Sequence, residues 1–371
     1  MKICIVLSTR PEIIKLSPLI RKLKSQRDEF YLINTNQHFL DKMSKVFFDF
    51  FKISGKIYNV NPDKKSQATF FSDSVKSIAK ILKKKKPSFL IVQGDTNTGL
   101  AGCMAASLVN RNLQNRDKIK IVHIESGLRS FDDTMPEEIN RKIIDQMSHI
   151  LFPPTKFDFN NLKKDNCLKF KKTFIVGNTI SDVLKRYELI ADKAKILKKL
   201  KLKKKKYFLV TLHRPESVDV KKNIISLFKT FKVLNKKYNY PIIFPIHPRT
   251  KDKVKKLNLS FGKSIKIIEP LEYLDFLKLM KDSKLVLSDS GGLQEEASIL
   301  GVPCVTLRTT TERQITLLRN VNIMAGYNQK KILNAVKKFH KKKIKKIKDF
   351  GNGNVTDKIY RKLKSLSKNF S

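Results

Sequence analysis

Residues 285–307, LVLSDSGGLQEEASILGVPCVTL, combine two short apolar runs with a glycine-containing turn and a helix-length segment. The apolar runs at 285–287 and 302–307 are typical of buried parallel strands. The turn at 288–292 lacks a bulky side chain, and Gly301 fits the position just after the end of a helix. The stretch therefore predicts a β-α-β unit.

The turn between these strands has the features of an anion-binding site. Unpaired N–H groups and the dipole at a helix start favour an anion, and glycine lets a phosphate approach the backbone closely. Glu296 follows one helical turn later, where its carboxylate could accept hydrogen bonds from sugar hydroxyls. The pattern indicates a sugar-nucleotide pocket, but an ordinary strand–turn–helix with a solvated acidic turn explains this stretch equally well.

The same alternation of apolar runs and amphipathic segments extends along most of the chain. Expected strands lie at residues 3–8, 30–34, 89–92, 119–124, 150–152, 174–176, 207–211, 242–246, 265–268, 285–287 and 303–307. This alternation predicts an α/β protein with parallel sheets covered on both faces. A chain of 371 residues suits two doubly wound, Rossmann-like domains. We expect residues 1–177 and a C-terminal helix, 355–371, in the first domain and 178–354 in the second, with the two facing across a cleft.

The chain is strongly basic, with 78 Lys and Arg against 33 Asp and Glu and a net charge of +45. This charge makes nucleic-acid binding a function to consider. The lysines, however, gather in local runs near helix ends and connectors, such as 83–86, 203–206 and 341–348. No RRM-type aromatic motif, zinc-finger spacing or Gly/Arg-rich tail accompanies them. We therefore expect a solvated lysine surface and no nucleic-acid partner.

Composition also indicates the compartment. The four cysteines are scattered without CxxC spacing, which is typical of packed thiols in a reducing setting. No run of about 18 uncharged apolar residues occurs, so no membrane span is expected. The N-terminal apolar run, 3–7, is shorter than the roughly 7–15 residues of a signal peptide. A cytoplasmic protein without a membrane partner is expected.

Residues that are unusual for a core follow the expected strands of the first half. Arg10 lies at a helix start, where a cation is unfavourable unless an anion such as a phosphate joins it. Asp95 and Glu125 each follow an apolar strand. Glu137 begins a helix-like segment, four residues before Arg141. Singly, these carboxylates could cap a helix or form a helical ion pair, but three of them at neighbouring segment ends favour catalysis.

Two expected strands of the second half end in histidine: His213 follows 207–211, and His247 follows 242–246. A histidine near a phosphate can neutralise charge and move a proton near neutral pH, although a lone strand-end histidine is usually structural. No GxGxxG follows the first strand, and neither a DxD triplet nor HExxH spacing occurs. A dinucleotide cofactor and a metal-held diphosphate are therefore not expected.

Taken together, these segments resemble the non-hydrolysing UDP-N-acetylglucosamine 2-epimerase family, which has the two-domain GT-B fold. The matching pieces run in family order from residue 8 to residue 313: STRPEIIKLSPLI, VQGDTNTGLAG, HIESGLRS, MPEEINR, VGNTISDVL, TLHRPESVD, PIHPR and SDSGGLQEEASILGVPCVTLRTTTER. Any single piece is weak, since SGGxxE also resembles other GT-B sugar-nucleotide enzymes. Their ordered co-occurrence over nearly the whole chain is specific.

The resemblance implies reversible conversion of UDP-GlcNAc to UDP-ManNAc at sugar C2, without NAD, another cofactor or a required metal, for cell-surface polysaccharide precursors. Expulsion of UDP from C1 gives oxocarbenium character, which makes the C2 proton removable. The resulting 2-acetamidoglucal is reprotonated from the other face before UDP returns. Such a path needs carboxylates around the sugar and cations around the diphosphate. Family members are commonly dimers, so a homodimer is expected.

The resemblance also implies roles for single residues, which we state for matching positions only. The catalytic positions are Asp95, Glu125, Glu137, His213 and Arg141, of which Arg141 orients the carboxylates. The substrate-binding positions are Arg10, Lys15, His213, Ser290, Gly291, Gly292, Glu296 and Arg313, with Glu296 as the ribose ligand. Which carboxylate removes the proton and which returns it stays open.

Other functions stay open beside the epimerase. A hydrolysing relative would share the fold and release UDP with free ManNAc, and a GT-B glycosyltransferase would bring an acceptor to the sugar. A nucleic-acid-binding protein would explain the charge but not the carboxylates. The segment NQHFLDK, 36–42, departs from family members with an allosteric UDP-GlcNAc site: Gln37 and His38 fit, but Lys42 stands near the place of a second Gln. Activation at such a site is in doubt.

Overall fold

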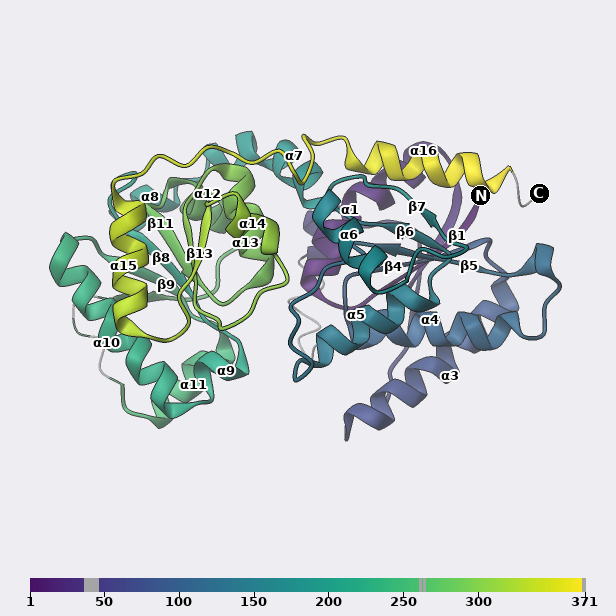
Figure 1. The fold of residues 1–371 in the computed structure, drawn as a ribbon, viewed down its shortest axis with the longest axis horizontal. Helices are drawn as coiled ribbons and strands as arrows, with labels where there is room; N and C mark the ends of the chain where they lie inside the picture. Colours follow the sequence, from purple (N-terminus) through teal and green to yellow (C-terminus); the bar gives the residue numbers. More distant parts are fainter. Residues whose placement is uncertain (37–46, 260–261, 263–264, 369–371) are drawn as a thin grey trace. The chain divides into compact units, whose positions relative to one another are not determined.

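The computed structural model describes residues 1–36, 47–259, 262 and 265–368. The chain divides into two compact units (Figure 1). Unit 1 comprises residues 1–183 and 349–371, and unit 2 comprises residues 184–348. The boundary near residue 183 falls within helix α7 (Ile180–Asp192).

Unit 1 contains a seven-stranded sheet in the order β3-β2-β1-β4-β5-β6-β7. All its strand pairs are parallel. In sheet order the strands are β3 (Lys56–Asn59), β2 (Glu29–Asn34), β1 (Lys2–Leu7), β4 (Phe89–Gln93), β5 (Lys120–Ile124), β6 (Ile150–Phe152) and β7 (Lys172–Thr173). The strand order reverses between β1 and β4, and doubly wound sheets bind ligands at the carboxyl ends of such a pair.

Helices cover both faces of this sheet (Figure 1). α3, α4 and α5 pack side by side on one face, and α1 packs with the C-terminal helix α16 on the other. Besides α7, the helices of unit 1 are α1 (Arg10–Ser25), α3 (Gln67–Lys85), α4 (Asn97–Asn110), η1 (Asn115–Asp117), α5 (Pro136–Met147), α6 (Lys156–Lys164) and, near the C-terminus, α16 (Val355–Ser367). This arrangement confirms the predicted α/β architecture for unit 1.

Unit 2 repeats the plan with a six-stranded parallel sheet in the order β10-β9-β8-β11-β12-β13. Its strands are β10 (Ile265–Ile268), β9 (Ile242–Pro245), β8 (Phe208–Thr211), β11 (Leu285–Ser288), β12 (Cys304–Thr306) and β13 (Asn322–Met324). Its helices are α8 (Ile196–Lys199), α9 (Pro215–Val218), α10 (Lys221–Tyr238), α11 (Pro248–Lys256), α12 (Tyr273–Asp282), α13 (Gly291–Leu300), α14 (Gln314–Leu318) and α15 (Gln329–His340). Here the strand order reverses between β8 and β11.

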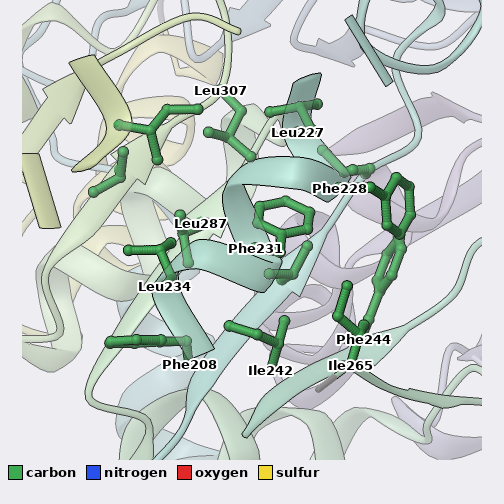
Figure 2. Packing of buried hydrophobic residues seen from close by; sticks show 14 of the residues in the cluster. Phe208, Leu227, Phe228, Phe231, Leu234, Ile242, Phe244, Ile265, Leu287 and Leu307 are labelled. Atoms are coloured by element: carbon green, nitrogen blue, oxygen red, sulfur yellow. The ribbon is translucent and has the colours of Figure 1, made fainter. Parts of the chain in front are cut away.

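Each sheet buries an apolar core against its helices. In unit 2, Figure 2 shows Phe231 of α10 packed among side chains of the sheet, including Phe208 and Leu287. In unit 1, the corresponding cluster joins β1, β4 and β5 to α3 and α4. Central strands such as residues 89–92 and 285–287 are apolar without alternation because both faces of a parallel sheet are covered. These rigid layers fix the positions of the strand ends.

The opening stretch folds as predicted, since β11, α13 and β12 form a parallel β-α-β unit. Gly301 follows α13 with φ of 72°, a left-handed conformation that glycine adopts without steric cost. Helix α1 begins in a similarly regular way. The Glu12 side chain accepts hydrogen bonds from the backbone N–H groups of Thr9 (2.8 Å) and Ser8 (3.0 Å), which would otherwise lack helical partners.

The predicted strands differ from the structure in three places. β3 and β13 were missed because both lie at sheet edges and are only four and three residues long. The apolar run at 174–176 is not a strand, and β7 lies just before it. The backbone N–H groups of Phe174 and Val176 still donate to the carbonyl oxygens of Leu151 and Pro153, at 3.0 and 3.3 Å, so the hydrogen bonding begun by β7 continues into the predicted run. None of the helices in the described ranges is long and apolar enough to cross a membrane.

Candidate active site

In unit 1, the predicted functional residues lie at the strand ends next to the reversal of strand order. Asp95 follows β4, and Glu125 follows β5 directly. Arg10 begins α1, which also carries Lys15. Glu137 lies in the first turn of α5 and is partly buried. The paired strands β4 and β5 therefore place two of the three predicted carboxylates at one sheet edge.

Glu125 is a buried carboxylate held by several donors. Its Oε2 atom accepts hydrogen bonds from Lys15 Nζ at 2.6 Å, Gln93 Nε2 at 2.8 Å and Asn178 Nδ2 at 3.3 Å. Its backbone is left-handed, with φ of 71°, which costs a residue with a Cβ atom about 1–2 kcal/mol. Such strain is found where function requires a side chain in one position. The structure thus joins two predicted residues, Lys15 and Glu125.

Asp95 is held through Arg141 of α5. The Arg141 guanidinium contacts the carboxylates of both Asp95 and Glu138. Glu138 is fully buried and also accepts hydrogen bonds from the backbone N–H of Ser130 at 2.9 Å. Arg141 is thereby fixed at both ends and can orient Asp95. Sequence reasoning considered Glu137, four residues before Arg141, and missed Glu138, although the Glu-Glu pair was visible.

A second buried hydrogen-bonding network, formed by His123, Asp145 and Arg129, lies next to these strand ends. His123 lies with Nδ1 2.7 Å from Asp145 Oδ1 and Nε2 2.8 Å from the carbonyl oxygen of Gly94. Arg129 Nη1 lies 2.7 Å from the other carboxylate oxygen of Asp145. Burial opposes ionisation of Asp145, but the neighbouring His123 and Arg129 lower its pKa. The network ties β5 and α5 to the loop that carries Asp95.

Arg10 combines partial burial with a position at a helix start. Its guanidinium lies 5.6 Å from the centroid of the Phe47 ring. Burial lowers the pKa of Arg10, because a desolvated cation is disfavoured. A bound anion would offset this cost, as the sequence predicted for a phosphate. Whether Arg10 binds substrate stays a prediction.

In unit 2, His213 and Asp289 lie at the ends of the central strands β8 and β11. Asp289 is fully buried, and its Oδ2 accepts hydrogen bonds from the backbone N–H groups of His213 and Arg214, both at 2.9 Å. His213 Nδ1 lies 3.0 Å from Asp289 Oδ1. Burial opposes ionisation of Asp289, whereas the imidazole and the two N–H groups lower its pKa. The sequence named His213 but gave Asp289 no role.

The two glycines after Ser290 have different surroundings. A Cβ atom on Gly291 would lie 2.6 Å from Glu312 Oε1 and 3.1 Å from Arg313 Nη1, so a larger residue there would displace these two side chains. A Cβ atom on Gly292 would have no neighbour within 4 Å. The backbone of the α13 N-terminus is therefore approachable at Gly292. This open position is where the predicted phosphate could reach the helix N–H groups.

Arg313 belongs to a buried cluster of alternating charges. Its Nε lies 2.9 Å from Glu295 Oε1, and its guanidinium also contacts Glu312. Arg308 Nη1 lies 3.1 Å from Glu312 Oε2. These pairs fix Arg313 beside the start of α13. A role in substrate binding stays a prediction for this residue.

Glu296 lies one turn into α13, as the sequence indicated, and is 8% exposed. Burial, followed by the charge of Glu296, raises the pKa of Tyr273 well above its ordinary value. A carboxylate beside a phenol that stays protonated is suited to accept hydrogen bonds from hydroxyl groups. This chemistry fits the predicted ribose contact.

The candidate second substrate site, with Gln37, His38 and Lys42, lies outside the described residues. Within residues 1–36, 47–259, 262 and 265–368, no three His, Cys, Asp or Glu side chains come together as a candidate metal centre. The four cysteines are buried and unpaired with one another.

The sequence model of the family described as UDP-N-acetylglucosamine 2-epimerase matches residues 21–364. The UDP-N-acetylglucosamine 2-epimerase of Methanococcus maripaludis is 47% identical over 361 residues, which cover 95% of each chain. These matches extend across both units. They confirm the resemblance drawn from the eight sequence pieces.

Solved structures agree with these matches. The crystal structure of Methanocaldococcus jannaschii UDP-GlcNAc 2-epimerase in complex with UDP-GlcNAc and UDP superposes with a TM-score of 0.90 at 43% identity, covering 98% of this chain and 100% of that one. The Neisseria meningitidis UDP-GlcNAc 2-epimerase bound to UDP-GlcNAc gives a TM-score of 0.87 at 29% identity, covering 98% and 100%. The predicted two-domain GT-B fold is thereby confirmed.

Proposed function

Because the chain belongs to the UDP-N-acetylglucosamine 2-epimerase family, we propose that it converts UDP-GlcNAc reversibly to UDP-ManNAc and is of the non-hydrolysing type. The family match over residues 21–364 and the 47% identity to an archaeal epimerase support the reaction. The non-hydrolysing type requires that UDP be retained and returned to the sugar. We assign the chemistry at the sugar to unit 1 and the retention of UDP to unit 2.

The observation that carries the proposal is the environment of Glu125. A carboxylate only 7% exposed, on strained backbone and held through one oxygen by Lys15, Gln93 and Asn178, is expensive to maintain for folding alone. Fixed negative charge stabilises the oxocarbenium character that arises when the C1–O bond breaks. We assign Glu125 to the sugar, together with Asp95.

Unit 1 would supply the proton chemistry. The C1–O bond breaks and its electron pair leaves with UDP, and a carboxylate takes the C2 proton, so that the C1–C2 double bond of the glycal forms. A proton delivered to the opposite face of C2 and attack of UDP on C1 then complete the epimerisation. Asp95, Glu125 and Glu137 are the candidate proton carriers, with Arg141 orienting Asp95.

Unit 2 would hold the leaving group. His213 and Ser290 lie at the ends of β8 and β11, and Gly292 opens the start of α13 to a phosphate. Glu296 would accept hydrogen bonds from the ribose. A tightly held UDP favours return to the glycal over escape. This retention separates the proposed reaction from hydrolysis.

Product analysis tests the proposal. Purified protein incubated with UDP-GlcNAc should give UDP-ManNAc, and the two nucleotide sugars should reach the same ratio when the reaction starts from UDP-ManNAc. Free UDP and free ManNAc appearing in equal amounts would instead identify a hydrolysing enzyme. A requirement for an added acceptor would identify a glycosyltransferase. The variant Glu125→Gln should lose turnover while its circular dichroism spectrum shows that it is folded.

The remaining expectations are separate from the reaction. A homodimer, a cytoplasmic location and the lack of a nucleic-acid partner stay predictions. Light scattering coupled to size-exclusion chromatography would measure the first. A binding isotherm with duplex DNA at several salt concentrations would measure the last, because binding through +45 charge falls steeply with salt.

A further inference from the structure

His213 has a buried carboxylate behind it that the sequence did not single out. The His213 side chain is 37% exposed, whereas that of Asp289 is 0% exposed. β8 and β11 are parallel neighbours, with Thr211 opposite Ser288, so both residues leave the sheet at the same level. Their side chains meet with Nδ1 of the imidazole 3.0 Å from Oδ1 of the carboxylate. The opposite side of the ring carries Nε2.

A purely structural role does not account for the charge of this carboxylate. Oδ2 caps the turn by accepting hydrogen bonds from the N–H groups of His213 and Arg214, and Oδ1 shares the His213 N–H at 3.2 Å. An asparagine oxygen would do this equally well and would avoid burying a charge. The second oxygen faces the imidazole, where a carboxylate can only accept a hydrogen bond. The charge of Asp289 therefore points to a function in His213.

We propose that Asp289 is a positioning residue for the epimerase reaction, which fixes Nδ1 of His213 as a donor and leaves Nε2 to face the diphosphate. The proposal rests on the proposed function, in which His213 contacts UDP. When the C1–O bond breaks, its electron pair goes to the β-phosphate oxygen, and the C2 proton goes to a carboxylate of unit 1. A protonated His213, with Nδ1–H on Asp289, meets the new phosphate charge through Nε2–H.

Within the described part of the chain, no contact supplies a second acceptor of this kind for Nδ1. The His247 ring lies 5.8 Å from that of His213 between centroids, and its own Nδ1 accepts the backbone N–H of Arg249. Burial raises the pKa of Tyr327, and the charges of Glu216, Asp289 and Arg308 also act on that pKa. The His247 ring and the backbone N–H of Arg214 lie against the pair. Among the contacts described, Asp289 is the carboxylate that reaches Nδ1.

The substitution Asp289→Asn separates the cap from the charge. Its oxygen should stay with the two backbone N–H groups, which turns the NH2 group toward His213. Nδ1 must then accept a hydrogen bond, so the neutral ring carries its proton on Nε2. That tautomer can still donate to a phosphate but cannot supply positive charge without a further proton. In the Ser-His-Asp triad, the equivalent change leaves the geometry intact and lowers kcat by about 10⁴.

The expected result is a loss of kcat of about 10²–10⁴, with KM for UDP-GlcNAc and Kd for UDP within about threefold of the wild type. Nitrogen-15 spectra of histidine-labelled protein, with His213 assigned by His213→Gln, should show the neutral ring protonated on Nδ1 in the wild type and on Nε2 in Asp289→Asn. The double variant, Asp289→Asn with His213→Gln, should have the same kcat as His213→Gln alone. Asp158→Asn, which removes the charge of another buried carboxylate that caps a helix, α6, is the matched control and should keep its kcat.

Three outcomes would overturn the proposal: wild-type His213 protonated on Nε2 when neutral, an unchanged kcat in Asp289→Asn, or losses that multiply in the double variant. The wild-type spectrum needs no substitution, so a variant that fails to fold does not prevent the test. A wrong proposed function would be distinguished from a wrong role for Asp289 by the products of the wild-type protein. In that case the wild-type protein would produce no UDP-ManNAc, while the spectra would still report the tautomer.

Discussion

The substitution Asp145→Asn should destabilise unit 1 far more than a substitution of a second carboxylate on the same arginine. Asp145 and Asp165 each lie 2.7 Å from Arg129, the first from Nη1 and the second from Nε. Their environments differ, since the Asp145 side chain is 0% exposed and that of Asp165 is 33% exposed. Asp145 also receives hydrogen bonds from His123 and the backbone N–H of Gly127. Asp165→Asn is therefore a matched control.

The magnitude follows from burial. Removing one partner of a buried ion pair costs about 3–5 kcal/mol, because an uncompensated charge stays in the core. The amide oxygen of the substituted side chain retains part of the hydrogen bonding, so we expect about 3 kcal/mol for Asp145→Asn. For Asp165→Asn we expect about 0–1 kcal/mol, since solvent screens the pair. With a urea dependence of about 2 kcal/mol/M, the first loss lowers the midpoint by about 1.5 M.

Urea unfolding followed by circular dichroism measures both variants, because the chain contains no Trp for fluorescence. The pH dependence adds a second readout. The pKa of Asp145 is lowered in the folded protein, so its contribution is present above the unfolded value and is lost as pH falls through the folded value. The gap between wild type and Asp145→Asn should stay constant from pH 7 to 5 and narrow below about pH 4. Equal losses for the two variants would refute the reasoning.

Further substitutions test packing and the site. Gly127→Ala should prevent stable folding of unit 1, because Gly127 has a φ of 81° and an added Cβ would lie 2.3 Å from a backbone oxygen. Gly94→Ala adds a Cβ that meets no atom within 4 Å, so it should lower the free energy of unfolding, measured by thermal unfolding, by only about 1–2 kcal/mol. Phe231→Ala should cost about 3–5 kcal/mol in urea unfolding, and Val233→Ala, 39% exposed on the same helix, less than about 0.5 kcal/mol. Lys15→Met should lower kcat at least about 100-fold in initial-rate assays with an unchanged circular dichroism spectrum; unaltered turnover would remove Lys15 from the site.

Local signals were sufficient to locate most of the secondary structure. The apolar run at 285–287 and the glycine at 301 predict β11 and the end of α13, since each depends on a few adjacent residues. Strands such as β13 carry too few residues to show a period, and their pairing is decided by the neighbouring strand. The run at 174–176 lies just after β7, and the backbone N–H groups of Phe174 and Val176 donate to Leu151 and Pro153, so the apolar pattern located this sheet edge but not the bounds of the strand.

The sequence indicated which polar residues follow the strands, but not what they contact. Glu125 could be recognised from its place after an apolar strand, yet its partner Asn178 lies 53 residues away in the sequence. Asp289 stands within the turn that opened the sequence analysis, and only the pairing of β8 with β11 shows that it meets His213. Which oxygen faces which donor depends on the register of strands, and a single sequence does not contain that information.

The central claim is that the protein breaks and remakes the C2–H bond while UDP is detached from C1. The most direct measurement is incubation of the wild-type protein with UDP-GlcNAc in deuterated water, followed by proton NMR of the recovered nucleotide sugars. The account predicts deuterium at C2 of both UDP-GlcNAc and UDP-ManNAc. Recovery of both sugars with protium at C2, from folded protein, would contradict it.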